Sequence, residues 1–261
     1  MDEIFRLRNG AFEQYEELLF ERDKVLREAG SIKISYMKEF GDLLLENMRI
    51  KVECIRKKKI IANCQVMKNH GQVINLQAIT DEIDREMDAY KASLESLMQE
   101  RDRARRSKTA TDEAIERAKK IYHRITKRIH PDIFPETTEN EELFDLWQRT
   151  AAAYRAIDPD ELEDIEALID IVLSRLGKYV LQAKIQNIEE RILRLEREIS
   201  HIIRSEPYIY DALLNDQIAV NEKKREIKTE TTEYQKYYEE LADKLKSLVA
   251  GEVVRFVWKT N

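Results

Sequence analysis

The stretch TDEAIERAKKIYHRITKRIHPDIFPETTENEELFDLWQRTAAAYRAIDPDEL, residues 111–162, decides the fold. Its first half places apolar residues every three or four positions between Ile115 and Ile129, which predicts an amphipathic helix that begins after an N-cap at Thr111. This helix must end at His130-Pro131, because proline disfavours helical geometry in the residue before it. A loop with two prolines follows, and a second amphipathic helix is predicted over residues 143–157.

The first of these helices is strongly basic on one side. Between Arg117 and Arg128 the sequence has six basic residues and no acidic one. Such a run is usually a solvated helix surface, but it also suits an acidic partner. The acidic run 158–164 that follows the second helix predicts a solvated helix start, and it could also pair with a basic face of the same chain.

The tripeptide His130-Pro131-Asp132 at the end of a basic helix resembles the J domain, the DnaJ-type module that stimulates DnaK-type chaperones. Pro135 matches a proline that is common in the loop of that family. Tyrosine and isoleucine precede the histidine by eight and five residues, where the family has Tyr and Leu. Ala-Tyr-x-x-Ile in the second helix resembles the family's Ala-Tyr-x-x-Leu, and a tryptophan stands where Phe is usual. The residues expected in the core of the module are Tyr122, Ile125, Ile129, Trp147, Tyr154 and Ile157.

The resemblance implies a binding function rather than catalysis. The basic face would meet an acidic surface of the chaperone, and the tripeptide would reach its domain junction and bias it towards ATP hydrolysis. In that loop Asp132 can accept hydrogen bonds with its charged carboxylate, and His130 can donate or accept one. Pro131 fixes the shape of the backbone between them. The expected chaperone-binding residues are His130, Pro131, Asp132, Arg117, Lys120, Arg124, Lys127 and Arg128.

The sequence departs from the J-domain pattern in several places. The first short helix of the family is absent, and the candidates to replace its packing are Leu94, Leu97 and Met98. Ile133-Phe134 replaces the polar pair that normally follows the tripeptide, and Thr150 replaces an apolar residue. These departures leave open a degenerate module that no longer stimulates a chaperone.

Long helices are predicted on both sides of this module. The sequence has six glycines and four prolines in 261 residues, and 37% of its residues are charged, which excludes a mainly β fold. Before the module, helical periodicity predicts a helix that ends at Gly30-Ser31, a second over about 32–69, and a third from about Asn75 to Arg106.

The C-terminal third has two heptad seams. One runs from Leu181 through Ile185 to Ile202 and the other from Leu213 to Leu248, with a short turn around Pro207 between them. This pattern predicts an antiparallel helical hairpin. The tail Val253–Trp258 is β-prone, and we expect it either to form a short strand or to dock on the bundle.

The predicted fold is therefore all-α: elongated helical-bundle or coiled-coil arms that flank a J-domain-like helical hairpin. The predicted domains are a long-helix bundle or hairpin over 1–108, the J-like module over 109–172, and a coiled-coil hairpin with its tail over 173–261.

Several classes of function are disfavoured by the sequence. There is no phosphate loop, no nucleotide-binding glycine pattern and no nucleophile motif, so we expect neither an enzyme nor a cofactor. His123 and His130 lie seven residues apart without a nearby cysteine or other histidine, so a zinc site is not expected. Two cysteines without metal or redox spacing, and an N-terminus without an apolar segment, predict a cytoplasmic protein that crosses no membrane.

The expected partners are a DnaK-type chaperone and an unidentified client or scaffold protein held by the helical arms, with a homodimer left open through exposed seam residues. The main alternative is a structural coiled-coil scaffold with a degenerate J-like domain. A second alternative is a nucleic-acid-associated protein that uses the basic runs at 56–59 and 101–108, although the net charge of −6 argues against wholesale nucleic-acid binding.

Overall fold

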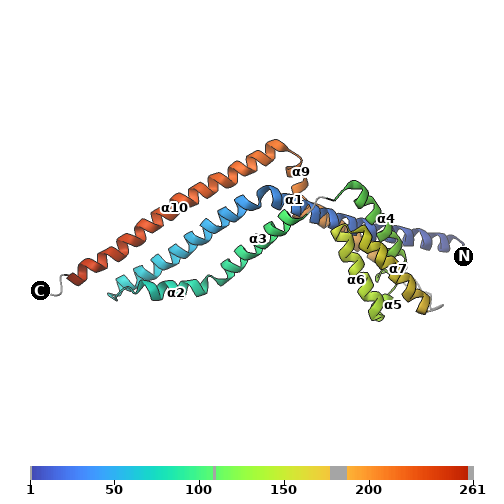
Figure 1. Cartoon of the computed structure of the whole chain (residues 1–261), viewed down its shortest axis with the longest axis horizontal. Helices are drawn as coiled ribbons and strands as arrows, with labels where there is room; N and C mark the ends of the chain where they lie inside the picture. Colours follow the sequence, from blue (N-terminus) through green and yellow to red (C-terminus); the bar gives the residue numbers. More distant parts are fainter. Residues whose placement is uncertain (1, 108–109, 177–186, 258–261) are drawn as a thin grey trace. The chain divides into compact units, whose positions relative to one another are not determined.

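The computed structural model describes residues 2–107, 110–176 and 187–257, and within these it describes the side chains from residue 10 to residue 250. Every regular element in the described residues is an α-helix, which confirms the predicted all-α class (Figure 1). The helices are α1 Asp2–Asn69, α2 Leu76–Glu86, α3 Asp88–Arg106, α4 Asp112–Ile129, α5 Glu136–Glu139, α6 Glu141–Ala156, α7 Pro159–Leu176, α8 Ile188–Arg204, α9 Tyr210–Leu214 and α10 Gln217–Val257.

Helix α1 is continuous over 68 residues, so the predicted break at Gly30-Ser31 is wrong. The hydroxyl of Ser31 donates a hydrogen bond to the carbonyl oxygen of Arg27, one turn back, and therefore does not cap a new helix. A glycine inside a helix costs only about 1 kcal/mol relative to alanine. Buried neighbours on both sides, Val25 and Met37 among them, offset that cost.

The other predicted ends in this part of the chain agree with the structure, with one addition. Helix α1 ends at Asn69, and Gly71 follows with φ of +67°, a conformation that glycine adopts without strain. Asn75 caps α2 by accepting a hydrogen bond from the backbone N–H of Ala78. The predicted third helix is divided at Met87, whose side chain is buried.

The chain folds into two compact units, and α1 contributes to both. Residues 1–33 and 108–211 form the first unit, and residues 34–107 and 212–261 form the second. This division differs from the three predicted domains, because the N-terminal part of α1 and α8 belong to the same unit as α4, α5, α6 and α7. Sequence periodicity does not distinguish which stretch of a long helix packs on which partner.

The core of the first unit is built from α4, α6 and α7. Its buried members include Ile125 of α4, Tyr154 of α6, and Leu162, Ile165 and Ile169 of α7. Helix α7 thus completes the packing for which Leu94, Leu97 and Met98 were the expected candidates. Those three residues lie in α3, which belongs to the second unit.

Each of the two C-terminal seams packs on α1. In the first unit, Ile192 and Leu195 of α8 form a buried cluster with Tyr15 and Leu19 of α1. In the second unit, the seam of α10 packs on α1 in three further clusters. The predicted hairpin of the two seams is therefore replaced by two pairings with α1; Leu181 and Ile185 lie outside the described residues.

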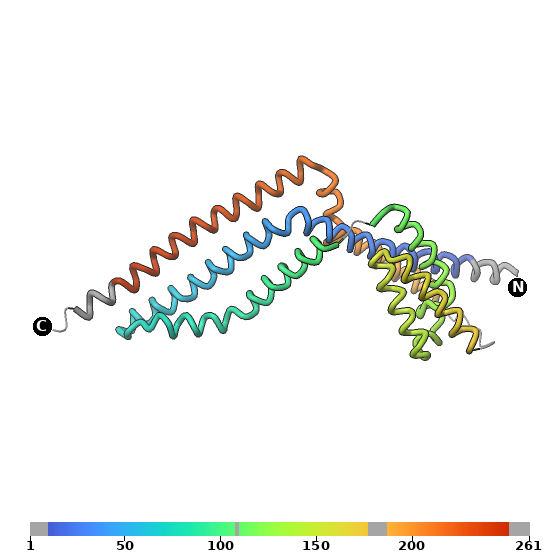
Figure 2. Tube along the Cα trace, viewed as in Figure 1, coloured from blue at the N-terminus to red at the C-terminus, as the bar shows by residue number. Residues whose placement is uncertain are grey.

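The second unit places the later part of α1 between two partners. Figure 2 shows α10 on one side of this stretch and the α2–α3 pair on the other. Cys64 and Ile60 of α1 pack with Ile79 and Ile83 of α2, and Phe40 of α1 packs with residues of α10.

The β-prone tail is helical as far as the structure describes it. Helix α10 continues to Val257, and Trp258 lies outside the described residues. Valine is only slightly less favourable in a helix than other residues, by less than about 0.7 kcal/mol, so a preceding long helix can extend through it. None of the described helices is long and apolar enough to cross a membrane.

Candidate functional site

Helix α4 is fixed at both ends by its sequence. The hydroxyl of Thr111 accepts a hydrogen bond from the backbone N–H of Ala114, and two acidic residues occupy the first turn. The helix ends at His130, whose ψ of 124° is extended, as proline at the next position requires. The tripeptide His130-Pro131-Asp132 therefore stands at a defined helix end.

Aromatic side chains join α4 to α6. The rings of Tyr122 and Tyr154 stack with their centroids 4.0 Å apart and their planes 9° apart, and Trp147 lies 5.9 Å from Tyr122. The ring centroids of His130 and Trp147 lie 4.4 Å apart, and the two rings meet edge to face. Tyr122 in the middle of α4 stacks on Tyr154 near the end of α6, whereas His130 after the last turn of α4 contacts Trp147 earlier in α6. The two helices are therefore antiparallel. All six residues expected in the core of the module lie in or against one cluster: Tyr122, Ile125, Ile129, Trp147, Tyr154 and Ile157.

His130 is almost completely buried, with 2% of its surface exposed. Its Nδ1 accepts a hydrogen bond from the backbone N–H of Asp132 at 3.0 Å, so the neutral ring carries its proton on Nε2. Within the described residues, Nε2 has no hydrogen-bond partner. Burial lowers the pKa of His130 to about 4, so the ring is neutral at pH 7.

The loop after His130 is held by α1 and α8. Ile133 is 1% exposed and lies in the cluster that Tyr15, Leu19, Ile192 and Leu195 form. The two apolar residues that depart from the J-domain pattern, Ile133 and the partly buried Phe134, thus anchor the loop to these helices. The sequence shows that these two residues are apolar, but it does not show which helices pack against them.

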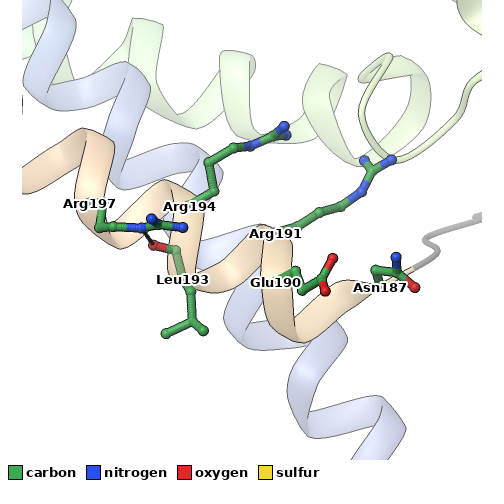
Figure 3. A pocket seen from close by; sticks show the side chains of 6 residues that line it. All are labelled: Asn187, Glu190, Arg191, Leu193, Arg194 and Arg197. Carbon is green, nitrogen blue, oxygen red and sulfur yellow. Dashed lines mark hydrogen bonds between the residues drawn. The ribbon is translucent and has the colours of Figure 1, made fainter.

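Asp132 is held by arginines from the same two helices. A guanidinium nitrogen of Arg22 in α1 lies 3.7 Å from Oδ2 of Asp132. Arg191 of α8 donates to the backbone oxygen of Asp132 at 3.4 Å, and Figure 3 shows its side chain extending from α8 beside Arg194. Arg22 also pairs with Asp23, which accepts a 2.7 Å hydrogen bond from the hydroxyl of Tyr122. Sequence reasoning missed Arg22, Asp23 and Arg191, since their roles depend on tertiary contacts.

The hollow drawn in Figure 3 lies on α8. It is lined by Asn187, Glu190, Arg191, Leu193, Arg194 and Arg197. Arg191 links it to the tripeptide, and Arg197 donates to the backbone oxygen of Leu193 within its own helix.

The basic face of α4 is largely paired within the first unit. Arg117 donates to both carboxylate oxygens of Glu163 at 2.9 and 2.6 Å, and Arg124 donates to those of Glu166 at 2.8 and 2.6 Å. Arg128 pairs with Asp170. All three carboxylates belong to α7, so the acidic run and its continuation pair with the basic face of the same chain.

The two lysines of this face differ. The ammonium nitrogen of Lys127 lies 3.4 Å from a carboxylate oxygen of Glu16 in α1. Lys120 is exposed and lines a hollow between α1 and α4. The hydrogen bond to Arg117 lowers the pKa of Glu163 and raises the pKa of Arg117. These pairs lie at the surface, where solvent and salt weaken them, so they stabilise the fold little. A partner with a stronger acidic surface can therefore compete for the arginines.

The basic runs of the second unit are also partly engaged. Arg56 donates to both carboxylate oxygens of Asp84 at 2.6 and 2.8 Å, and the ammonium of Lys57 lies 4.2 Å from the ring centroid of Tyr238. Arg101 and Arg105 both pair with Asp42. Several cations of these runs are therefore paired within their own unit at a partly exposed surface; Lys108 lies outside the described residues.

His123, the other histidine of α4, packs on Phe20 of α1 with ring centroids 4.0 Å apart. Burial, followed by the charge of Lys127, lowers the pKa of His123. The described residues contain no group of three or more His, Cys, Asp or Glu side chains arranged to hold a metal ion.

No family model matches this chain, and no match was found among curated proteins or solved structures.

Proposed function

We propose that the protein is a J-domain-type co-chaperone that binds a DnaK-type chaperone and stimulates its ATP hydrolysis. One observation carries this proposal: His130-Pro131-Asp132 ends a basic helix that packs antiparallel on α6 through Tyr122, Trp147 and Tyr154. That combination of tripeptide, basic face and aromatic contact is what the family resemblance requires.

The binding surface in this proposal combines the tripeptide with the basic face of α4. Its members are His130, Pro131, Asp132, Arg117, Lys120, Arg124, Lys127 and Arg128. Lys120 is exposed, and the other basic members are in pairs whose carboxylates a more acidic surface can replace. The side chain of Asp132 retains 38% exposure, so its carboxylate is partly open to solvent although Arg22 faces it.

The proposal also includes a client or scaffold protein for the second unit and a cytoplasmic location. Cys54 and Cys64 are free and buried, which is consistent with a reducing compartment. We do not favour nucleic-acid binding, since several cations of the runs at 56–59 and 101–108 are already paired with carboxylates of the same unit.

The direct test is single-turnover ATP hydrolysis by a DnaK-type chaperone with increasing amounts of the full chain. We expect the wild type to stimulate hydrolysis, and His130→Gln and Asp132→Asn to lose stimulation, because both remove groups of the tripeptide. His201→Gln is the matched control, since His201 is an exposed histidine of α8. Circular dichroism verifies that each variant is folded; unchanged stimulation by both tripeptide variants would contradict the proposal.

A structural role for the module is the second candidate. The burial of His130 and the pairing of the basic face within the chain favour it, because both use the predicted binding groups internally. This candidate predicts no stimulation by the wild type at any concentration in the same assay.

A further inference from the structure

The tripeptide loop is covered by two helices that lie outside the core of the J-like module. Ile133, the residue after Asp132, is buried among Tyr15 and Leu19 of α1 and Ile192 and Leu195 of α8. We call the set Tyr15, Leu19, Arg22, Arg191, Ile192 and Leu195 the loop cover.

The loop cover also neutralises the charge of the loop. Arg22 approaches the carboxylate of Asp132 at 3.7 Å, and Arg191 binds its backbone oxygen at 3.4 Å. A cation that binds this aspartate in a partner would have to displace the arginine that already faces it. The cover therefore competes with a partner for the same carboxylate.

The core of the module does not need α8. The buried members of its cluster all come from α4, α6 and α7, and the residues of α8 belong to a separate cluster. Displacement of α8 would uncover the side of Ile133 that packs on α8 and release the backbone oxygen of Asp132 from Arg191. Tyr122 and Tyr154 would remain packed. The cover is thus placed where it can open without loss of the module.

We propose that the loop cover is autoinhibitory: a DnaK-type chaperone engages the tripeptide only in the minor population in which α8 has left Ile133. This inference rests on the proposed function and adds a regulatory step to it. The apparent affinity of such a chain for its partner is reduced by the fraction of molecules that are open. Any substitution that favours opening should therefore lower the concentration needed for half-maximal stimulation.

The releasing variant is Leu195→Ser, which replaces a side chain that is 2% exposed in the cover. Its matched control is Leu193→Ser, the same substitution on the same helix at a side chain that is 56% exposed. Should Leu195→Ser lose helical signal in circular dichroism, Arg191→Ala takes its place, with Arg194→Ala as the control. Arg194 is an exposed arginine of the same helix (Figure 3).

Opening is measured without any chaperone by thiol labelling of Ile133→Cys. The native Cys54 and Cys64 are buried in the second unit, and burial raises the pKa of both thiols, so they serve as slow internal references. We expect Leu195→Ser to accelerate labelling of the introduced thiol by at least about tenfold, as loss of a buried leucine implies, and Leu193→Ser to leave it unchanged.

Stimulation of ATP hydrolysis is then titrated with the chain that has the native Ile133. The concentration for half-maximal stimulation should fall with Leu195→Ser by the same factor as labelling rises, because both report one opening equilibrium. Equal labelling in wild type and Leu195→Ser would overturn the inference, as would faster labelling with an unchanged half-maximal concentration. If labelling accelerates and no variant stimulates hydrolysis, the displaceable cover stands and the proposed co-chaperone function falls.

Discussion

At the scale of single residues, His130 is a buried polar side chain at the end of α4. It combines 2% exposure with an Nε2 proton that has no acceptor among the described residues. A buried donor without a partner costs about 1–3 kcal/mol, a cost that core packing alone does not require.

The buried imidazole predicts a pH-dependent stability. The folded pKa of His130 is lowered from 6.5 to about 4, so between these values the unfolded chain binds a proton that the folded chain does not. Stability is therefore fully present above pH 6.5 and falls as the pH drops, by about 2 kcal/mol by about pH 5. Urea unfolding at several pH values measures this slope.

The control for this slope is a pair of histidine substitutions. His130→Gln should remove most of the pH dependence in this window and leave the part that His123 contributes, whereas His201→Gln, a substitution at an exposed side chain, is the control. An identical slope in wild type and His130→Gln would show that another group titrates.

The sequence identified residues whose roles depend on local patterns. Thr111, Asn75 and the helix end at His130 followed from capping and proline rules, and Tyr122, Trp147 and Tyr154 followed from periodicity with the family resemblance. Arg22 and Tyr15 were not found, because a residue more than 100 positions from the tripeptide has no local signal of its contact. The apolar Ile133 was the one residue whose type indicated, in the sequence, that other helices cover the loop.

At the scale of elements, α1 contains glycines that differ in their surroundings. A Cβ added at Gly30 would meet nothing within 4 Å, whereas one at Gly41 would lie 2.9 Å from Cγ of Arg101. Gly30→Ala should therefore raise the free energy of unfolding by about 0.5–1 kcal/mol, because alanine loses less backbone entropy in a helix. Gly41→Ala, the matched comparison, should gain less or lose stability. Denaturant unfolding measures both, and an equal gain at the two positions would contradict the contact with Arg101.

The ion pairs between α4 and α7 predict an effect on association rather than on stability. Replacement of Glu163 and Glu166 by glutamine should change the free energy of unfolding little, since both ion pairs lie at the surface. It should also free Arg124, leave Arg117 paired with Asp160 alone, and raise the rate of association with an acidic chaperone surface several-fold at low salt. Stopped-flow association at two ionic strengths measures the effect.

Asp164→Asn provides the control for these charges. Asp164 is an exposed carboxylate of the same helix, and its removal changes the net charge without freeing an arginine of α4. If Asp164→Asn accelerates association as much as Glu163→Gln does, net charge rather than release of the basic face is responsible.

Helix boundaries were more predictable from the sequence than helix partners. Heptad periodicity in α8 and α10 marked the apolar seams correctly, but a seam specifies only that some apolar surface must cover it. Helix α1 offers suitable surface along its length, with Tyr15 and Leu19 for α8 and Phe40 for α10. The break expected at Gly30 failed for a related reason, since packing on both sides of a glycine outweighs its low helix propensity.

At the scale of the whole molecule, two units share one helix but have separate cores. The clusters of the first unit draw on residues up to Phe20 of α1, and those of the second begin with Tyr36, among the residues whose side chains the structure describes. Separate cores allow one unit to lose its packing while the other keeps it. Among the described residues, α1 is the one long helix that contributes residues to both units.

This division predicts that damage to one core is local. Phe40 is fully buried in the second unit, and Phe40→Ala should destabilise that unit by about 3–5 kcal/mol. The fluorescence of Trp147, measured in a Trp258→Phe background, should then report a nearly unchanged unfolding midpoint for the first unit, while far-UV circular dichroism shows an earlier loss of helix. Ile169→Ala, which removes a fully buried residue of the first unit, should shift the fluorescence of Trp147 instead. If Phe40→Ala moves both signals together by the same amount, the two cores unfold as one cooperative body, and α1 transmits the loss of packing from one unit to the other.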